Sequence, residues 1–188
     1  MLYHVSHEAG LKVLKPHVST HKKAYVYAIN NLVTGLLFGA KQDDFDFIIS
    51  TDENDKPVLY ECYPDAFGKV YQGKGCSAYV VSEEGFLRNM TSWSPELVCE
   101  TEVPVLEEII IENLYQKLLE EEAQGNIQIH RYEFNDTYRK KISSHIVDRL
   151  IRFDMLDNDC LDHDERFTTH FKRIVEALRN AADGHLLQ

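Results

Sequence analysis

The spacing of apolar residues along the chain changes from alternating to helical and back several times. At the start, LYHVS alternates as a strand does, and AYVYA runs directly into INNLVTGLLFGAK, where apolar residues recur every three or four positions. This predicts a strand that is followed directly by a helix over residues 29–41. A strand that begins at residue 2 has to be paired within a sheet, because free chain ends fray. We therefore expect His4 to lie on a rigid element.

Short β-type runs separated by turn sequences follow this helix. The runs are FDFIIS, PVLYECY, GKVYQG and SAYVVS, and the segments between them are TDENDK, PDAFG and GKG. Two further strand segments lie in ELVCETEVPVLEEIII, on either side of Pro104, because proline cannot donate a hydrogen bond within a sheet. The pattern predicts a meander of antiparallel strands.

Helical spacing dominates the remaining two fifths of the chain. ENLYQKLLEEEAQG predicts a helix that ends at Gly125, and NIQIHRY predicts one returning strand. Two amphipathic helices are expected after residue 134, with apolar stripes that need a partner surface. The stripe of the first is Ile142, Ile146 and Leu150, and that of the second is Phe167, Phe171, Ile174, Val175, Leu178 and Ala182. We therefore predict an α+β fold: a mostly antiparallel twisted sheet with packed helices over 1–134, and a C-terminal helical pair over 135–188 packed on it as a single compact unit.

Composition indicates an ordered globular protein. Of its 188 residues, 44% are hydrophobic, which is enough for a substantial core. A net charge of −11 argues against nucleic acid and anionic membranes as partners. No apolar run has the length of a membrane span and no secretory signal is recognisable, so we expect a cytoplasmic location. Free thiols are expected because no C-x-x-C pair occurs among Cys62, Cys76, Cys99 and Cys160.

Two stretches contain residue types that bind metals, but the surrounding sequence does not favour a metal site in either. His17 and His21 have the spacing of a helical metal pair, yet Pro16 and the surrounding VSTHKK are typical of a loop. The acidic run DNDCLDHDE lacks the glycine and the spaced glutamate of an EF-hand calcium loop, and is better suited to connect two helices. We therefore expect no metal cofactor.

The candidate catalytic and binding residues occur along the chain in the order histidine, tyrosine, glutamate. His4 stands in YHVS, Tyr27 in VYA before the apolar helix, and Glu96 in PELVCETEV. This order resembles the His-Tyr-Glu branch of the ADP-ribosyltransferase superfamily, which includes the poly-ADP-ribose polymerases and many bacterial toxins. The resemblance covers roughly residues 2–130, with Val5 where the family usually has glycine. It implies that the sheet is of the ADP-ribosyltransferase type.

The resemblance also implies a role for each residue, with NAD as the substrate. His4 would hydrogen-bond the adenosine ribose, with Ser6 beside it among the NAD-binding residues. Tyr27 would stack on nicotinamide, and the carboxylate of Glu96 would bind a hydroxyl of the nicotinamide ribose. The implied function is that of an NAD-dependent ADP-ribosyltransferase or NAD glycohydrolase with an unknown acceptor. The alternative is a non-catalytic binding or interaction module on the same scaffold, with the C-terminal helices as its contact surface.

These residue types suit the cleavage of NAD in their own right. Breaking the bond between nicotinamide and ribose develops positive charge on the sugar, which a fixed carboxylate stabilises. Three carboxylates compete for this role, because Glu96, Glu100 and Glu102 share one face of the expected strand, and neighbours on a face lie about 6.6 Å apart. We expect Glu96, which begins the strand after Pro95, and keep Glu100 as the second choice. Surface roles for all three, and a purely structural role for His4, are the alternatives.

Strand parity adds a geometric expectation about the aromatic residues. Tyr25 and Tyr27 are two positions apart in a strand, so their side chains should share one face of the sheet. We expect His4 and at least one of these tyrosines to line a common cleft from neighbouring strands.

Overall fold

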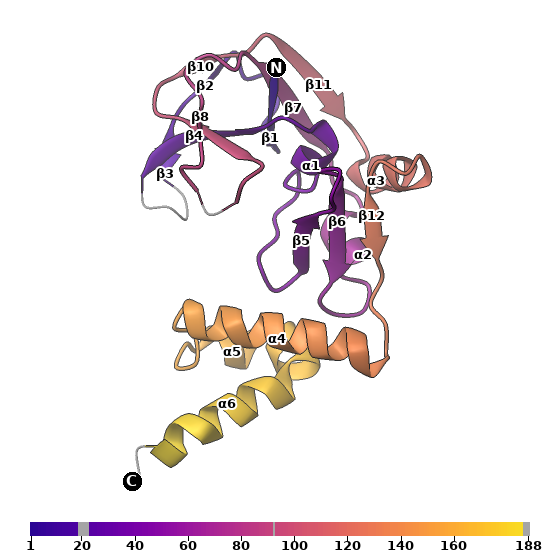
Figure 1. Ribbon diagram of the computed structural model, residues 1–188, viewed down its shortest axis with the longest axis vertical. Helices are drawn as coiled ribbons and strands as arrows, with labels where there is room; N and C mark the ends of the chain where they lie inside the picture. The colour runs from indigo at the N-terminus through magenta and orange to yellow at the C-terminus, as the bar shows by residue number, and fades with distance from the viewer. Residues whose placement is uncertain (19–22, 92, 186–188) are drawn as a thin grey trace. The chain divides into compact units, whose positions relative to one another are not determined.

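The computed structural model describes residues 1–18, 23–91 and 93–185, and these form an α+β fold built around an antiparallel sheet (Figure 1). The main sheet has seven strands in the order β11-β7-β1-β4-β9-β8, with β3 also paired to β4. Each pairing in it is antiparallel. Strands β10 and β2 form a second sheet, and β12, β6 and β5 a third. The predicted fold class is therefore confirmed.

The elements in chain order are β1 (Leu2–Ser6), β2 (Val13–Leu14), β3 (His17–Val18), β4 (Ala24–Ile29), α1 (Leu32–Leu36), β5 (Phe47–Thr51), β6 (Pro57–Glu61), α2 (Ala66–Tyr71), β7 (Cys76–Val81), β8 (Leu87–Arg88), β9 (Glu96–Cys99), β10 (Val103–Pro104), β11 (Glu107–Ile111), α3 (Leu114–Ala123), β12 (Gln128–His130), α4 (Asp136–Arg152), α5 (Cys160–His163), the π-helix η1 (Arg166–His170) and α6 (Lys172–His185).

Two compact units divide the chain. The first unit comprises Met1–Lys41, Thr51–Val58 and Phe67–Gln128, and the second comprises Gln42–Ser50, Leu59–Ala66 and Ile129–Gln188. The second unit thus begins its long C-terminal segment at Ile129, six residues before the predicted start at residue 135, and it takes in two segments that the sequence assigned to the core. The packing of the C-terminal helices on the main sheet stays a prediction.

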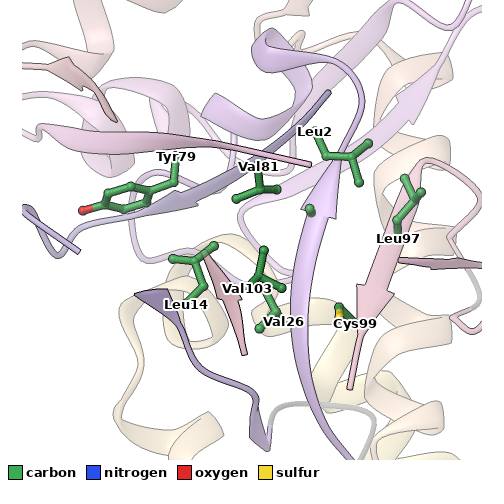
Figure 2. Packing of buried hydrophobic residues seen from close by; sticks show 9 residues of the cluster. Leu2, Leu14, Val26, Tyr79, Val81, Leu97, Cys99 and Val103 are labelled. Atoms are coloured by element: carbon green, nitrogen blue, oxygen red, sulfur yellow. The ribbon is translucent and has the colours of Figure 1, made fainter. Parts of the chain in front are cut away.

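One hydrophobic cluster of the first unit lies on one face of the main sheet (Figure 2). Alternate side chains of β1, β4, β7 and β9 supply most of it, and β2 and β10 cover them. The members are Leu2, Leu14, Val26, Ala28, Tyr79, Val81, Leu97, Cys99 and Val103. On the other face, α1 packs closely: a methyl group on Gly35 would lie 3.1 Å from side-chain carbons of both Ile29 and Val5.

The predicted helix over 29–41 is much shorter in the structure. Ile29 still belongs to β4, and α1 begins only after Asn31, whose side-chain oxygen accepts from the Thr34 N–H at 3.1 Å. The helix ends before Gly39, where the chain passes so close to β7 that a Cβ would lie 2.7 Å from the Cys76 sulfur. Close contact with the sheet therefore stops a helix that the apolar spacing would continue.

The prediction of a strand for GKVYQG is wrong, because these residues belong largely to α2. Phe67 and Tyr71 lie four positions apart, are buried, and have ring centroids 5.0 Å apart. Their spacing with Ala66 and Val70 is helical, and the glycine between them masks this in a short window.

The first of the two predicted C-terminal helices is confirmed, whereas the second is not one continuous helix. In α4 the predicted stripe of Ile142, Ile146 and Leu150 is buried. The second helix is divided into α5, η1 and α6, although Phe167 and Phe171 are buried as expected. All four cysteines lie within the described residues and are free thiols. Among the helices described, none combines the length and the hydropathy that crossing a bilayer requires.

Candidate functional site

His4, Tyr27 and Glu96 lie on three consecutive strands of the main sheet. Strand β4, which carries Tyr27, is flanked by β1 on one side and β9 on the other. Tyr3 pairs with Ile29, and Ile29 in turn pairs with Glu96. The fold therefore brings the N-terminal histidine and a glutamate more than ninety residues later to the same end of one strand.

His4 lies where β1 and β4 separate. Along these two fully described strands the register contains one pair, Tyr3 with Ile29. Beyond it, Nδ1 of His4 is 2.7 Å from the carbonyl oxygen of Tyr27. Because a carbonyl oxygen can only accept, Nδ1 carries the hydrogen and donates it. The His4 side chain thus donates to the Tyr27 carbonyl oxygen, which would otherwise accept from a backbone N–H of a paired strand.

The environment of His4 favours its neutral form. Burial lowers the pKa of the imidazole and the nearby His17 lowers it further, while the bond to the Tyr27 carbonyl acts in the opposite direction. With its hydrogen on Nδ1, the neutral ring has an unprotonated Nε2 that accepts a hydrogen bond. The hydroxyl of a sugar is a suitable donor to this atom.

The stability of the protein should fall with acidification because of His4. Its folded pKa is below the ordinary value of about 6.5, so the unfolded chain binds the proton more readily, and stability decreases as pH falls from about 6.5 through the folded pKa. His4→Asn, which can keep the donor at the Nδ1 position, should lose less stability than the parent between pH 7.5 and pH 5. Urea unfolding at both pH values measures this difference. An identical loss in parent and variant would contradict it.

The two tyrosines of β4 share a face, as predicted. Their ring centroids are 5.9 Å apart, and the rings meet edge to face. Tyr25 is buried, with 4% of its surface exposed, whereas Tyr27 is partly exposed. Tyr27 is therefore the member of the pair whose ring has surface available for a ligand.

His17 also belongs to this neighbourhood, although its sequence context predicted a loop. The prediction is wrong because His17 lies on β3 and pairs with Tyr25. Its ring centroid is 6.1 Å from that of Tyr27, and its charge lowers the pKa of His4. The available signal was Val18, a β-branched residue next to His17 that favours a strand. His21, its proposed metal partner, lies outside the described residues.

Glu96 acts electrostatically on Tyr27. Burial raises the pKa of the Tyr27 hydroxyl, and the charges of Glu96 and Tyr25 raise it further. In the register, Tyr27 pairs with Val98, which is two positions from Glu96 and so on the same face of β9. The Tyr27 hydroxyl therefore stays protonated beside a carboxylate.

The two competing carboxylates lie beyond the end of β9 and are held in ion pairs. Glu100 is 2.6 Å from the ammonium nitrogen of Lys23, and Glu102 is 3.8 Å from that of Lys15. Both pairs are exposed to solvent. Glu96 is thus the candidate whose charge reaches the Tyr27 ring, while the other two neutralise lysines.

The side chains of His4 and Tyr27 approach their common region from different faces of the sheet. His4 pairs with Tyr79 of β7, and their rings stack with centroids 6.3 Å apart on the side of the core. Tyr27 alternates with the core residues Val26 and Ala28, so its ring lies on the other side. The two rings therefore lie on opposite faces of the sheet, so the structure does not provide the common cleft expected for His4 and Tyr27.

Ser6 shapes the chain just after His4. Its hydroxyl oxygen accepts from the N–H of Glu8 at 3.1 Å, and in the register it pairs with Ser77 of β7. It is partly exposed. Ser6 therefore fixes the start of the loop that follows β1, and its contact with NAD stays a prediction.

The described part of the chain has no group of three or more histidine, cysteine, aspartate or glutamate side chains arranged to hold a metal ion. Comparisons with protein-family models, with curated proteins and with solved structures found no match for this chain. Inferences about function therefore depend on the residues of the chain itself and their geometry.

Proposed function

We propose that the protein is an NAD-dependent ADP-ribosyltransferase or an NAD glycohydrolase. The observation that supports this most is the arrangement of His4, Tyr27 and Glu96 on the adjacent strands β1, β4 and β9. His4 bonds the backbone of Tyr27, and the charge of Glu96 acts on the same tyrosine. The three residues therefore form one local system. Water as the acceptor gives the glycohydrolase, and another nucleophile gives the transferase.

In the proposed complex each residue has one task. Nε2 of His4 accepts a hydrogen bond from a hydroxyl of the adenosine ribose, and the ring of Tyr27 packs on nicotinamide. The bond between nicotinamide and ribose breaks with its electron pair leaving on nicotinamide. The carboxylate of Glu96 stabilises the positive charge that develops on the sugar, and the acceptor then adds to this sugar and releases a proton. In this arrangement NAD has to contact both faces of the sheet, because His4 and Tyr27 lie on opposite faces.

Two measurements on the purified protein test the proposal. Calorimetric titration with NAD measures binding, and chromatography of the reaction mixture measures released nicotinamide. Binding with release supports the enzyme. Binding without release supports the alternative of a non-catalytic binding module on the same scaffold. A parent protein that does not bind NAD overturns both the enzyme and its nucleotide site.

His4→Ala and Tyr27→Ala should each weaken NAD binding by about 1–3 kcal/mol, because the first removes a hydrogen bond and the second a stacking surface. Both side chains are only partly buried, so the variants should fold. Calorimetry of the two variants measures the effect. His163→Ala, which changes an exposed histidine of the second unit, is the control and should bind NAD as the parent does. Parent-like binding by both test variants would remove these residues from the site.

A further inference from the structure

The loop of residues 7–12, between β1 and β2, is tied to the main sheet by two side chains from distant parts of the chain. The Tyr79 hydroxyl donates to the Glu8 carbonyl oxygen at 2.6 Å and accepts from the Leu11 N–H at 3.3 Å. The Gly10 N–H donates to Oε1 of Glu108 at 2.8 Å. Three backbone groups of one short loop are thus bound by side chains of β7 and β11.

The carboxylate of Glu108 is itself held in place. Its Oε1 also accepts from the Ser77 hydroxyl at 2.8 Å and lies 3.2 Å from the Tyr79 hydroxyl oxygen. The hydrogen bonds from the Gly10 N–H and the Ser77 hydroxyl lower the pKa of Glu108, so the carboxylate is ionised at neutral pH. Gly10 reaches it with a φ of +77°, a backbone conformation that favours glycine.

Tyr79 and Glu108, which anchor the loop, lie in one row with His4. In the register His4 pairs with Tyr79, and Tyr79 pairs with Glu108, so the three side chains share one face of β1, β7 and β11. Tyr79 is fully buried at one end of the core cluster, with its hydroxyl directed away from the other labelled side chains (Figure 2). The side chain of Leu11 packs on the same cluster. The row therefore connects the position of the loop to the position of His4.

We propose that Tyr79 and Glu108 are positioning residues for the NAD site, which hold the loop of residues 7–12 beside His4 as a wall against the bound nucleotide. This inference rests on the proposed function. Neither side chain touches the reacting atoms. Loosening the loop should weaken NAD binding and leave the cleavage step, which depends on Glu96, unchanged.

The test uses Tyr79→Phe, which keeps the buried ring and removes the hydroxyl, and Glu108→Gln, which keeps the size and removes the charge. Glu107→Gln is the matched control, because Glu107 is exposed, neighbours Glu108 on β11 and pairs with Val80 instead of Tyr79. We expect the KM for NAD to rise about tenfold in both test variants, with kcat for nicotinamide release within about twofold of the parent. A merely structural role would lower the melting temperature without raising KM.

A second measurement needs no NAD. Amide hydrogen exchange at Gly10 and Leu11, followed by NMR, should be faster in Glu108→Gln and Tyr79→Phe respectively, and unchanged in Glu107→Gln. Unchanged exchange in the test variants overturns the anchor itself. Faster exchange with an unchanged KM in an active protein overturns the link to NAD. Faster exchange in the test variants, together with a parent that does not bind NAD, confirms the anchor and overturns both the proposed function and the positioning role.

Discussion

Replacing Glu96 with glutamine should reduce the rate of nicotinamide release about 100- to 1,000-fold, the loss typical when one preorganised electrostatic contact to a transition state is removed. Glutamine keeps the size of the side chain and its capacity to accept a hydrogen bond, but it lacks the negative charge. The affinity for NAD should change little, because the charge on the sugar develops only as the bond breaks. Initial rates of nicotinamide release at saturating NAD measure the effect.

The matched control is Glu100→Gln, on the same segment of chain. Glu100 lies beyond the end of β9 and bonds the ammonium group of Lys23 at 2.6 Å in an exposed pair, which contributes little to stability. This variant should release nicotinamide as the parent does. Loss of activity in Glu100→Gln alone would move the catalytic role to Glu100. Full activity in both variants would exclude the β9 segment from the mechanism.

Local patterns predicted the longer strands of the fold and its longer helices, but not β3 or α2, because alternation and helical spacing are properties of neighbouring residues. The stripe of α4 and the end of α3 before Gly125, whose φ is +77°, belong to this class. The length of α1 does not, because contact with Cys76 at Gly39 limits it. Packing against a distant strand cannot be read from the residues of the helix.

The residue types of the candidate site could be predicted from the sequence, but the strand pairings and bonds that join them could not. The types of His4, Tyr27 and Glu96, and their order, stand in the sequence. The pairing of β4 with β9 joins segments about seventy residues apart, and only the folded sheet reveals it. The same holds for the bond from Gly10 to Glu108, two residues separated by 98 positions. Contacts at such separations depend on topology, which local periodicity does not encode.

The second unit contains an ion-pair cluster that no local pattern indicates. Arg166 of η1 bonds Asp43 at 2.6 Å, Asp46 at 2.9 Å and Asp164 at 2.7 Å. Asp46, with 7% of its surface exposed, also accepts from the Tyr63 hydroxyl at 2.9 Å. Burial lowers the pKa of Arg166, but the hydrogen bonds to Asp164 and Asp43 and the charges of Asp46 and Asp43 outweigh it and raise the pKa. One arginine therefore compensates several carboxylates from two distant segments.

Arg166→Met should destabilise the second unit by about 3 kcal/mol, because it keeps an apolar stem of similar length while it leaves the buried Asp46 without its cation. Urea unfolding at pH 7 measures the loss. Lys172→Met is the control, since Lys172 is exposed and its nearest carboxylate, on Glu176, is 3.9 Å away. It should unfold as the parent does. Adding Asp46→Asn to Arg166→Met should recover part of the loss, because it removes the uncompensated charge. An Arg166→Met variant as stable as Lys172→Met would show that this cluster contributes nothing to the second unit.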